Sequence, residues 1–200
     1  MILPIQNSIL LSTNKIQTDF LRIDMVHPII SGNKWFKLKY IFEDKKCIEA
    51  KTIVSFGGNW SNHLIATAYY ANLNNKKSIG YVHTYQPPIL NDCLLEATHY
   101  GMDIRFVEKK TFLNLIKNCT NANEEYIIPF GGNSEIGLKG TSEILQSANT
   151  NIYTHIVTAI GTGTTFAGLY TSKLPFQKII GINVIKNNKN VIQDIENILH

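Results

Sequence analysis

Short apolar segments alternate regularly with stretches of helical composition from residue 52 to the end of the chain. The apolar segments span residues 52–56, 79–82, 104–107, 126–130, 155–160 and 179–185, and the helical stretches include 61–73, 89–100, 111–119, 138–147 and 191–199. A short, continuously apolar run between helices is typical of a strand buried on both faces, as the strands of a parallel sheet are. The sequence therefore predicts an α/β fold with parallel sheets and right-handed crossovers.

Residues 1–50 fit this alternation less well, and predict one strand near residues 20–23 and one helix over residues 34–42. The chain has 200 residues, of which 44% are hydrophobic and 17% are charged. This is the composition of a globular protein, and it excludes the disordered and coiled-coil classes. The length fits one large domain or two small ones.

The net charge of +4 is a mild excess of basic residues. The lysine pairs at 45–46, 76–77 and 109–110 are interpreted most simply as solvated surface, because lysine side chains usually stay exposed. No nucleic-acid-binding motif accompanies these pairs. We therefore expect no nucleic-acid partner.

The cysteines and the N-terminal segment bear on the cellular compartment. Cys47, Cys93 and Cys119 lack the spacing of a zinc site, so they predict reduced thiols and no bound metal. Residues 1–17 lack the basic segment of a signal peptide. No stretch reaches the roughly 18 apolar residues of a membrane span. We expect a soluble, cytoplasmic protein without membrane contacts.

In α/β sheets, ligands bind beyond the carboxyl ends of the strands, so the strand-to-helix turns deserve most weight. Three such turns are rich in glycine and small polar residues, at 55–63, 130–137 and 160–168. In the third, Gly161 and Gly163 permit a tight turn before a helix, where successive N–H groups favour an anion. Thr162, Thr164 and Thr165 add hydroxyl donors. This turn predicts a phosphate site, or else a glycine-rich connector with helix-capping residues.

The first turn places Ser61, Asn62 and His63 at the start of a helix. Ser61 or Asn62 is a candidate N-cap, and that structural role is sufficient to explain a lone Ser-Asn pair. The functional interpretation is a carboxylate site built from the helix N-terminal amides and the Ser61 hydroxyl. His63 and Trp60 border this site, or else serve in packing.

A fourth segment, residues 32–40, carries Lys34, Lys37 and Lys39 on a predicted helix. These lysines form either a solvated basic face or a site in which one amine is a covalent carrier. A lysine amine forms a Schiff base when burial or a neighbouring cation lowers its pKa. Lys37 lies one helical turn after Lys34 and is placed to supply such a charge.

Together, the motifs resemble the pyridoxal 5'-phosphate (PLP) dependent enzymes with the tryptophan-synthase-β fold. Within them, the chain is most similar to the 1-aminocyclopropane-1-carboxylate deaminase and D-cysteine desulfhydrase group. The resemblance is carried, in order, by residues 22–24 (RID), 31–38 (SGNKWFKL), 55–63 (SFGGNWSNH), 128–137 (IPFGGNSEIG) and 161–165 (GTGTT). Several spaced motifs in the same order are more specific than any one of them.

The resemblance implies a role for each matching residue. Lys34 would carry PLP as a Schiff base and act as a base, and Asn62 would hydrogen-bond the cofactor's ring hydroxyl. Ser61, assisted by Asn62 and His63, would bind the substrate carboxylate, and Ser61 would also take part in catalysis. The phosphate would be held by Gly161, Thr162, Gly163, Thr164 and Thr165. The implied reaction converts a small amino acid, 1-aminocyclopropane-1-carboxylate or one like D-cysteine, into ammonia and a 2-keto acid.

The resemblance also implies two α/β lobes and a homodimer. Residues 38–129 would form the small lobe. Residues 1–37 and 130–200 would form the cofactor lobe, which would be incomplete because the relatives continue past the position of His200. Two alternatives remain open: a shortened, non-catalytic relative that serves as a binding or assembly module, and a nucleotide-binding protein that uses only the loop 161–165.

Overall fold

The central strand of the larger sheet, β3 (Thr52–Gly57), is buried along almost its whole length. It pairs in parallel with β4 (Lys77–His83) and β6 (Glu125–Ile128), and β4 pairs in parallel with β5 (Met102–Val107). The strand order is β5-β4-β3-β6. The computed structural model, which describes residues 2–84, 89–121, 124–185 and 190–200, thus confirms the predicted parallel α/β architecture.

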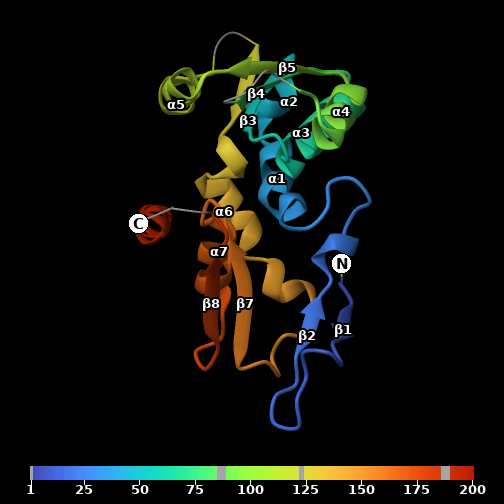
Figure 1. Cartoon of the computed structure of the whole chain (residues 1–200), viewed down its shortest axis with the longest axis vertical. Helices are drawn as coiled ribbons and strands as arrows, with labels where there is room; N and C mark the ends of the chain where they lie inside the picture. Colours follow the sequence, from blue (N-terminus) through green and yellow to red (C-terminus); the bar gives the residue numbers. More distant parts are fainter. Residues whose placement is uncertain (1, 85–88, 122–123, 186–189) are drawn as a thin grey trace.

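Helices cover both faces of this sheet (Figure 1). One face carries α3 (Asn62–Leu73) and α4 (Asp92–His99), and the other carries α5 (Lys109–Asn118). Because Leu64, Val82 and Leu94 are completely buried together between α3, α4 and the sheet, this apolar layer fixes where α3 begins. The short helix α2 (Lys45–Glu49) packs beside β6.

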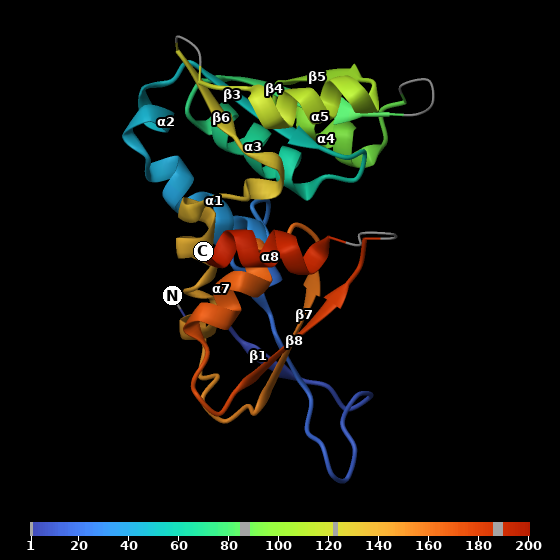
Figure 2. The same ribbon diagram turned by 90° about the vertical axis from the view of Figure 1, so that its left-hand side faces the viewer.

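A second parallel pair joins β7 (His155–Ile160) and β8 (Lys178–Asn183), with α7 (Thr164–Ser172) as the crossover between them. The C-terminal helix α8 (Val191–Leu199) packs against α7 (Figure 2). Near the N-terminus, β1 (Ile5–Asn7) and β2 (Asp19–Leu21) form an antiparallel hairpin. Single 3-10 turns lie at Ile23–Met25, Phe130–Gly132 and Ile144–Ser147.

Three helices in contact connect the two sheets. Helix α1 (Asn33–Glu43) packs on α6 (Glu135–Thr141), and α6 packs on α7. The first of these contacts needs a glycine, because a Cβ atom at Gly140 would overlap the backbone carbonyl of Phe36. This close approach sets the position of α1 relative to the turn that precedes α7.

Some element boundaries differ from the sequence-based expectation. The predicted helix over residues 138–147 begins earlier, at Glu135, because Ser134 caps it by accepting a hydrogen bond from the N–H of Gly137. It ends at Thr141 and is followed by a separate 3-10 turn. The helix predicted from residue 89 begins at Asp92, and the Pro87-Pro88 pair before it lies outside the described residues. Strand β1 and helix α2 were not predicted.

Within the part of the chain that the structure describes, every helix is too short or too polar to cross a membrane.

Candidate active site

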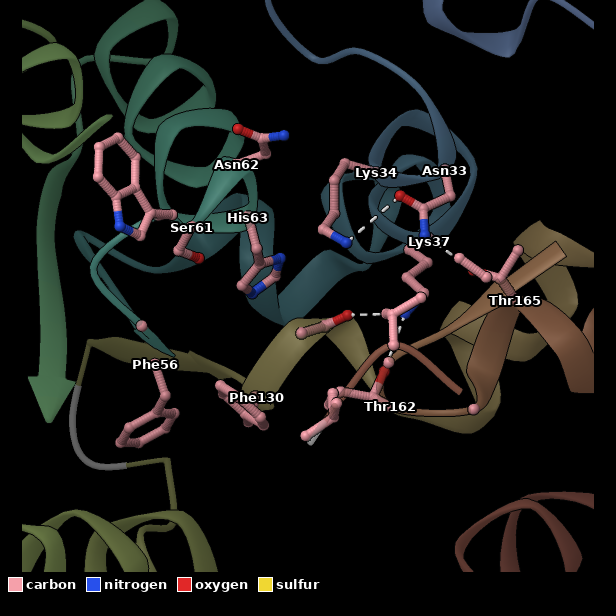
Figure 3. A pocket seen from close by; sticks show the side chains of 18 of the residues that line it. Asn33, Lys34, Lys37, Phe56, Ser61, Asn62, His63, Phe130, Thr162 and Thr165 are labelled. Carbon is pink, nitrogen blue, oxygen red and sulfur yellow. Dashed lines mark hydrogen bonds between the residues drawn. The ribbon is translucent and has the colours of Figure 1, made fainter. Parts of the chain in front are cut away.

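A cavity of about 820 Å³ opens where four segments of the chain meet (Figure 3). These segments are the start of α1, the β3–α3 turn, the 3-10 turn after β6, and the β7–α7 turn, and residues 184–185 after β8 complete the lining. The predicted site residues that line the cavity are Lys34, Ser61, Asn62, His63, Gly161, Thr162, Gly163 and Thr165. The structure therefore brings together residues that are more than a hundred positions apart in sequence, while Thr164 lies buried behind the wall.

Lys34 and Lys37 reach the cavity from the same face of α1. Lys34 Nζ donates a hydrogen bond to Asn33 Oδ1 at 3.3 Å. Asn33 Nδ2 in turn donates to Thr165 Oγ1 at 2.9 Å. This pair of contacts links the first turn of α1 to the first turn of α7.

Lys37 is only 3% exposed, so the interpretation of a solvated basic face is wrong for this side chain. Its Nζ donates to the carbonyl of Gly131 at 3.0 Å and to Thr162 Oγ1 at 3.1 Å. In Figure 3 the Lys37 side chain extends from α1 toward Thr162. The ammonium of Lys37 is thus held against the phosphate-loop candidate.

The cavity is electropositive. Among the described residues that line it, Lys34 and Lys37 are cationic and no side chain is a carboxylate. Burial lowers the pKa of Lys34. Burial, together with the charge of Lys34, lowers the pKa of Lys37 to about 7. A site of this kind favours an anionic ligand, which would offset the cost of two desolvated ammonium groups.

The β7–α7 turn lines the cavity at the N-terminus of α7. Gly163 precedes the helix with a φ of 87°, and a Cβ atom there would lie 2.9 Å from Ile195 of α8. The first intrahelical bond in this turn runs from Ala167 N to Gly163 O, so the N–H groups before it remain for a ligand. The hydroxyl of Thr164 is engaged elsewhere and donates to Asn133 Oδ1 at 3.0 Å.

The β3–α3 turn contributes the N-terminus of a second helix. Ser61 is the N-cap of α3, and its Oγ accepts a hydrogen bond from Leu64 N at 3.3 Å. Ser61 is therefore the helix N-cap that the sequence predicted. Its own hydroxyl hydrogen remains free to be donated to a ligand. Trp60, at the rim, is 73% exposed and does not serve as a packing residue.

His63 is 2% exposed and forms a pair with Ser55, which is completely buried on β3. The Nε2 atom of His63 lies 2.8 Å from Ser55 Oγ, and the Nδ1 atom has no hydrogen-bond partner among the described residues. Burial and the charges of Lys34 and Lys37 lower the pKa of His63 well below its usual range. In sequence, Ser55 stands at the start of the first turn with no predicted role, and its eight-residue separation from His63 gives no local signal.

The depressed pKa of Lys37 predicts a pH dependence of stability. Between pH 7 and 8.5 the unfolded chain keeps a proton on Lys37 that the folded chain loses, so raising the pH favours the folded state. The free energy of unfolding should rise by roughly 1–2 kcal/mol over this range. Urea unfolding at several pH values measures the slope, and the K37M variant should flatten it. A slope of equal size in K37M would contradict the assignment.

No protein-family model matches this chain. It is 29% identical to a Thermotoga maritima protein that provisionally carries the name 1-aminocyclopropane-1-carboxylate deaminase, over 84% of this chain and 59% of the relative. It is 27% identical to an Arabidopsis thaliana bifunctional D-cysteine desulfhydrase/1-aminocyclopropane-1-carboxylate deaminase, over 74% of this chain and 43% of the relative. A Yersinia pestis D-cysteine desulfhydrase is also 27% identical, with 84% and 57% covered.

Solved structures of similar fold include enzymes of the same kind. A homologue of 1-aminocyclopropane-1-carboxylate deaminase superimposes with a TM-score of 0.83 at 24% identity, covering 100% of this chain and 65% of that protein. A PLP-dependent aspartate racemase gives a TM-score of 0.65 at 17% identity, with 90% and 56% covered. The chain thus spans about 43–59% of the length of the curated relatives described above. The resemblance inferred from the motifs is confirmed: the chain is similar in sequence to the deaminase and desulfhydrase group and has the α/β fold of the PLP-dependent enzymes related to tryptophan synthase β.

Proposed function

We propose that this chain carries the PLP site of a deaminase or desulfhydrase that acts on a small amino acid and releases ammonia and a 2-keto acid. The observation that carries the proposal is the single cavity that joins Lys34 and Lys37 to the turn 161–165 and to the N-terminus of α3. An amine, an anion-binding turn and a second helix N-terminus are the groups that an aldehyde cofactor with a phosphate tail and an amino-acid substrate require.

The residues present fit this cofactor. Two buried acceptors at the cavity, Asn59 Oδ1 and His63 Nδ1, lack partners among the described residues, as expected where a polar ligand binds. The excess of two lysines over carboxylates in the lining matches a ligand that carries a phosphate. When bound, PLP supplies an electron sink for the bond broken at the substrate Cα.

Each group of residues has a separate task in this proposal. Lys34 attaches the cofactor through its amine, and its lowered pKa increases the fraction that is unprotonated and nucleophilic. Lys37, Thr162 and the N–H groups of the β7–α7 turn bind the phosphate. Asn62, as the resemblance implies, contacts the cofactor ring. We also propose that Lys34 moves the proton at the substrate Cα.

The N-terminus of α3 is proposed to bind the substrate carboxylate. The N–H groups of its first turn point outward, and the positive end of the helix dipole favours an anion there. The Ser61 hydroxyl adds a donor, because its oxygen already accepts from Leu64 N and its hydrogen is free. This arrangement places the carboxylate on the wall next to Lys34 and His63.

Covalent capture of PLP tests the proposal. Protein saturated with PLP should show a visible absorption band that free PLP lacks, and borohydride reduction followed by peptide mapping should find the label on Lys34. The K34R variant keeps the positive charge but should show no label. Absence of the band in saturated protein, or a label on Lys37 instead, would contradict the proposal.

Activity is measured on the same preparation as ammonia and 2-keto acid released from D-cysteine and from 1-aminocyclopropane-1-carboxylate. Labelling of Lys34 without turnover of either compound would exclude these two substrates and favour the non-catalytic binding module. Thermal stabilisation by a nucleotide but not by PLP would favour a nucleotide-binding protein instead. The homodimer and the cytoplasmic location implied by the resemblance stay predictions.

A further inference from the structure

Ser55 and His63 form a buried hydrogen-bond chain that ends at a backbone carbonyl. Ser55 Oγ donates to the carbonyl oxygen of Ile128 at 3.0 Å, and the same oxygen lies 2.8 Å from His63 Nε2. Ser55 is completely buried and His63 is 2% exposed. Because water is excluded from this chain, each hydrogen atom in it has a defined place.

The chemistry of these groups determines the tautomer of His63. A carbonyl oxygen can only accept, so the hydroxyl hydrogen of Ser55 is committed to Ile128. Ser55 Oγ then offers only a lone pair to His63, and Nε2 must carry the hydrogen of the neutral ring. Nδ1 is consequently a bare acceptor.

The ring that carries this acceptor belongs to the cavity wall. His63 lines the cavity, and its Nδ1 has no hydrogen-bond partner among the described residues. In Figure 3 the ring lies between the hydroxyl of Ser61 and the amine of Lys34. A buried acceptor left without a partner costs free energy, which a ligand with an N–H or O–H donor would recover.

His63 is a poor general base in this setting. Burial opposes a positive charge on the His63 ring, and the charges of Lys34 and Lys37 oppose it further, so the pKa of His63 is well below its usual range. Behind the ring, the chain through Ser55 ends at the carbonyl of Ile128, which cannot take a proton onward. Nδ1 is therefore suited to accept a hydrogen bond and not to remove a proton.

We propose that His63 Nδ1 binds the amino group of the amino-acid substrate, and that Ser55 is the positioning residue that keeps Nδ1 free of hydrogen. This inference rests on the proposed function, which places the substrate carboxylate at the N-terminus of α3. The amino group and the carboxylate are bonded to the same carbon, so an acceptor on the first turn of that helix is within reach of the amine. The carboxylate itself has no hydrogen to donate to Nδ1.

The tautomer can be observed directly by ¹⁵N NMR of the histidine-labelled 200-residue chain. Of the six histidines, His63 is assigned by the signal that disappears in H63Q. We expect a protonated Nε2 and an unprotonated Nδ1 in the unmodified protein and in S55T, which keeps the hydroxyl. S55A should populate the opposite tautomer. If either Ser55 variant fails to fold, the spectrum of the unmodified protein still decides, and a protonated Nδ1 there would overturn the inference.

Comparing glycine with acetate distinguishes binding of the amino group from binding of the carboxylate, because acetate has no amino group. At saturating concentration, glycine should shift the Nδ1 resonance of His63 and acetate should leave it in place. Equal shifts with both compounds, or no shift with glycine, would overturn the inference.

Two substitutions of His63 distinguish the roles of its two ring nitrogen atoms. The amide of H63N places an acceptor near the position of Nδ1, whereas the amide of H63Q reaches toward Ser55. H63Q should reduce the preference for glycine over acetate by about tenfold, the size expected for one charge-assisted hydrogen bond. H63N should retain most of that preference. Equal preferences in H63Q and the unmodified protein would speak against the inference.

These measurements do not depend on covalent attachment of PLP. Failure of Lys34 labelling with the expected NMR result would reject the proposed PLP site and keep only the assignment of His63 Nδ1 as an acceptor for an amino group. Labelling of Lys34 together with a protonated Nδ1 would support the proposed function and reject the role of His63.

Discussion

Replacing Gly140 with alanine should destabilise the protein by about 3 kcal/mol or more, an effect at the upper end of overpacking substitutions. A Cβ atom at this position would overlap the Phe36 carbonyl of α1, and a backbone atom cannot rotate away as a side chain can. The gain in helix propensity from glycine to alanine, about 1 kcal/mol, is too small to offset this. Urea unfolding measures the difference between the two proteins.

Gly58 provides the matched control for Gly140. A Cβ atom at Gly58 would meet no heavy atom within 4 Å, and its φ lies outside the left-handed region. The G58A variant should therefore stay within about 1 kcal/mol of the unmodified protein. Equal stability of G140A and G58A would show that α1 and α6 do not need this close contact.

Replacing Lys37 with methionine should weaken the binding of PLP by roughly tenfold to a hundredfold, the expected loss of one or more charge-assisted hydrogen bonds. The substitution removes the cation that contacts Thr162 in the proposed phosphate site. It should leave the affinity for pyridoxal, which lacks the phosphate, almost unchanged. Titration monitored by tryptophan fluorescence compares the two ligands, because Trp60 lines the cavity.

The K37M substitution should leave the free energy of unfolding unchanged or raise it. Methionine has a similar length and carries no charge, and replacing a buried cation with an apolar side chain is often neutral or stabilising. Lys39 is the control: it lies on the same helix and pairs with Glu143 outside the cavity lining. A loss of PLP affinity in K39M as large as in K37M would contradict a specific role for Lys37.

The parts of the fold that the sequence predicted well are those with long, uninterrupted patterns. The strand β3 and the helices α3 and α8 lie within a residue or two of their expected bounds. The missed elements, β1 and α2, have three and five residues, which is too few for a period to be recognised. Helix α6 was misplaced because Gly137, which permits a close contact with the Gly132 carbonyl, looks like a helix breaker in sequence, so the predicted helix began after it.

The candidate site divides in the same way. Lys34, Ser61 and the turn 161–165 stand in local motifs, and the structure brings them to one cavity. The burial of Lys37 depends on contacts with Gly131 and Thr162, which are 94 and 125 positions away, so it required the tertiary structure. The pairing of Ser55 with His63 likewise exists only after β3 and α3 are placed against each other.

The contact of α1, α6 and α7 has a consequence for engineering. Because regular, tightly packed helices set the separation between Lys34 and the 161–165 turn, surface loops can vary without changing that spacing. The exposed indole of Trp60, by contrast, stands at the entrance and supports none of these helices. Libraries that diversify this entrance can therefore broaden or narrow the range of accepted molecules while the helices that hold the Lys34 amine stay intact.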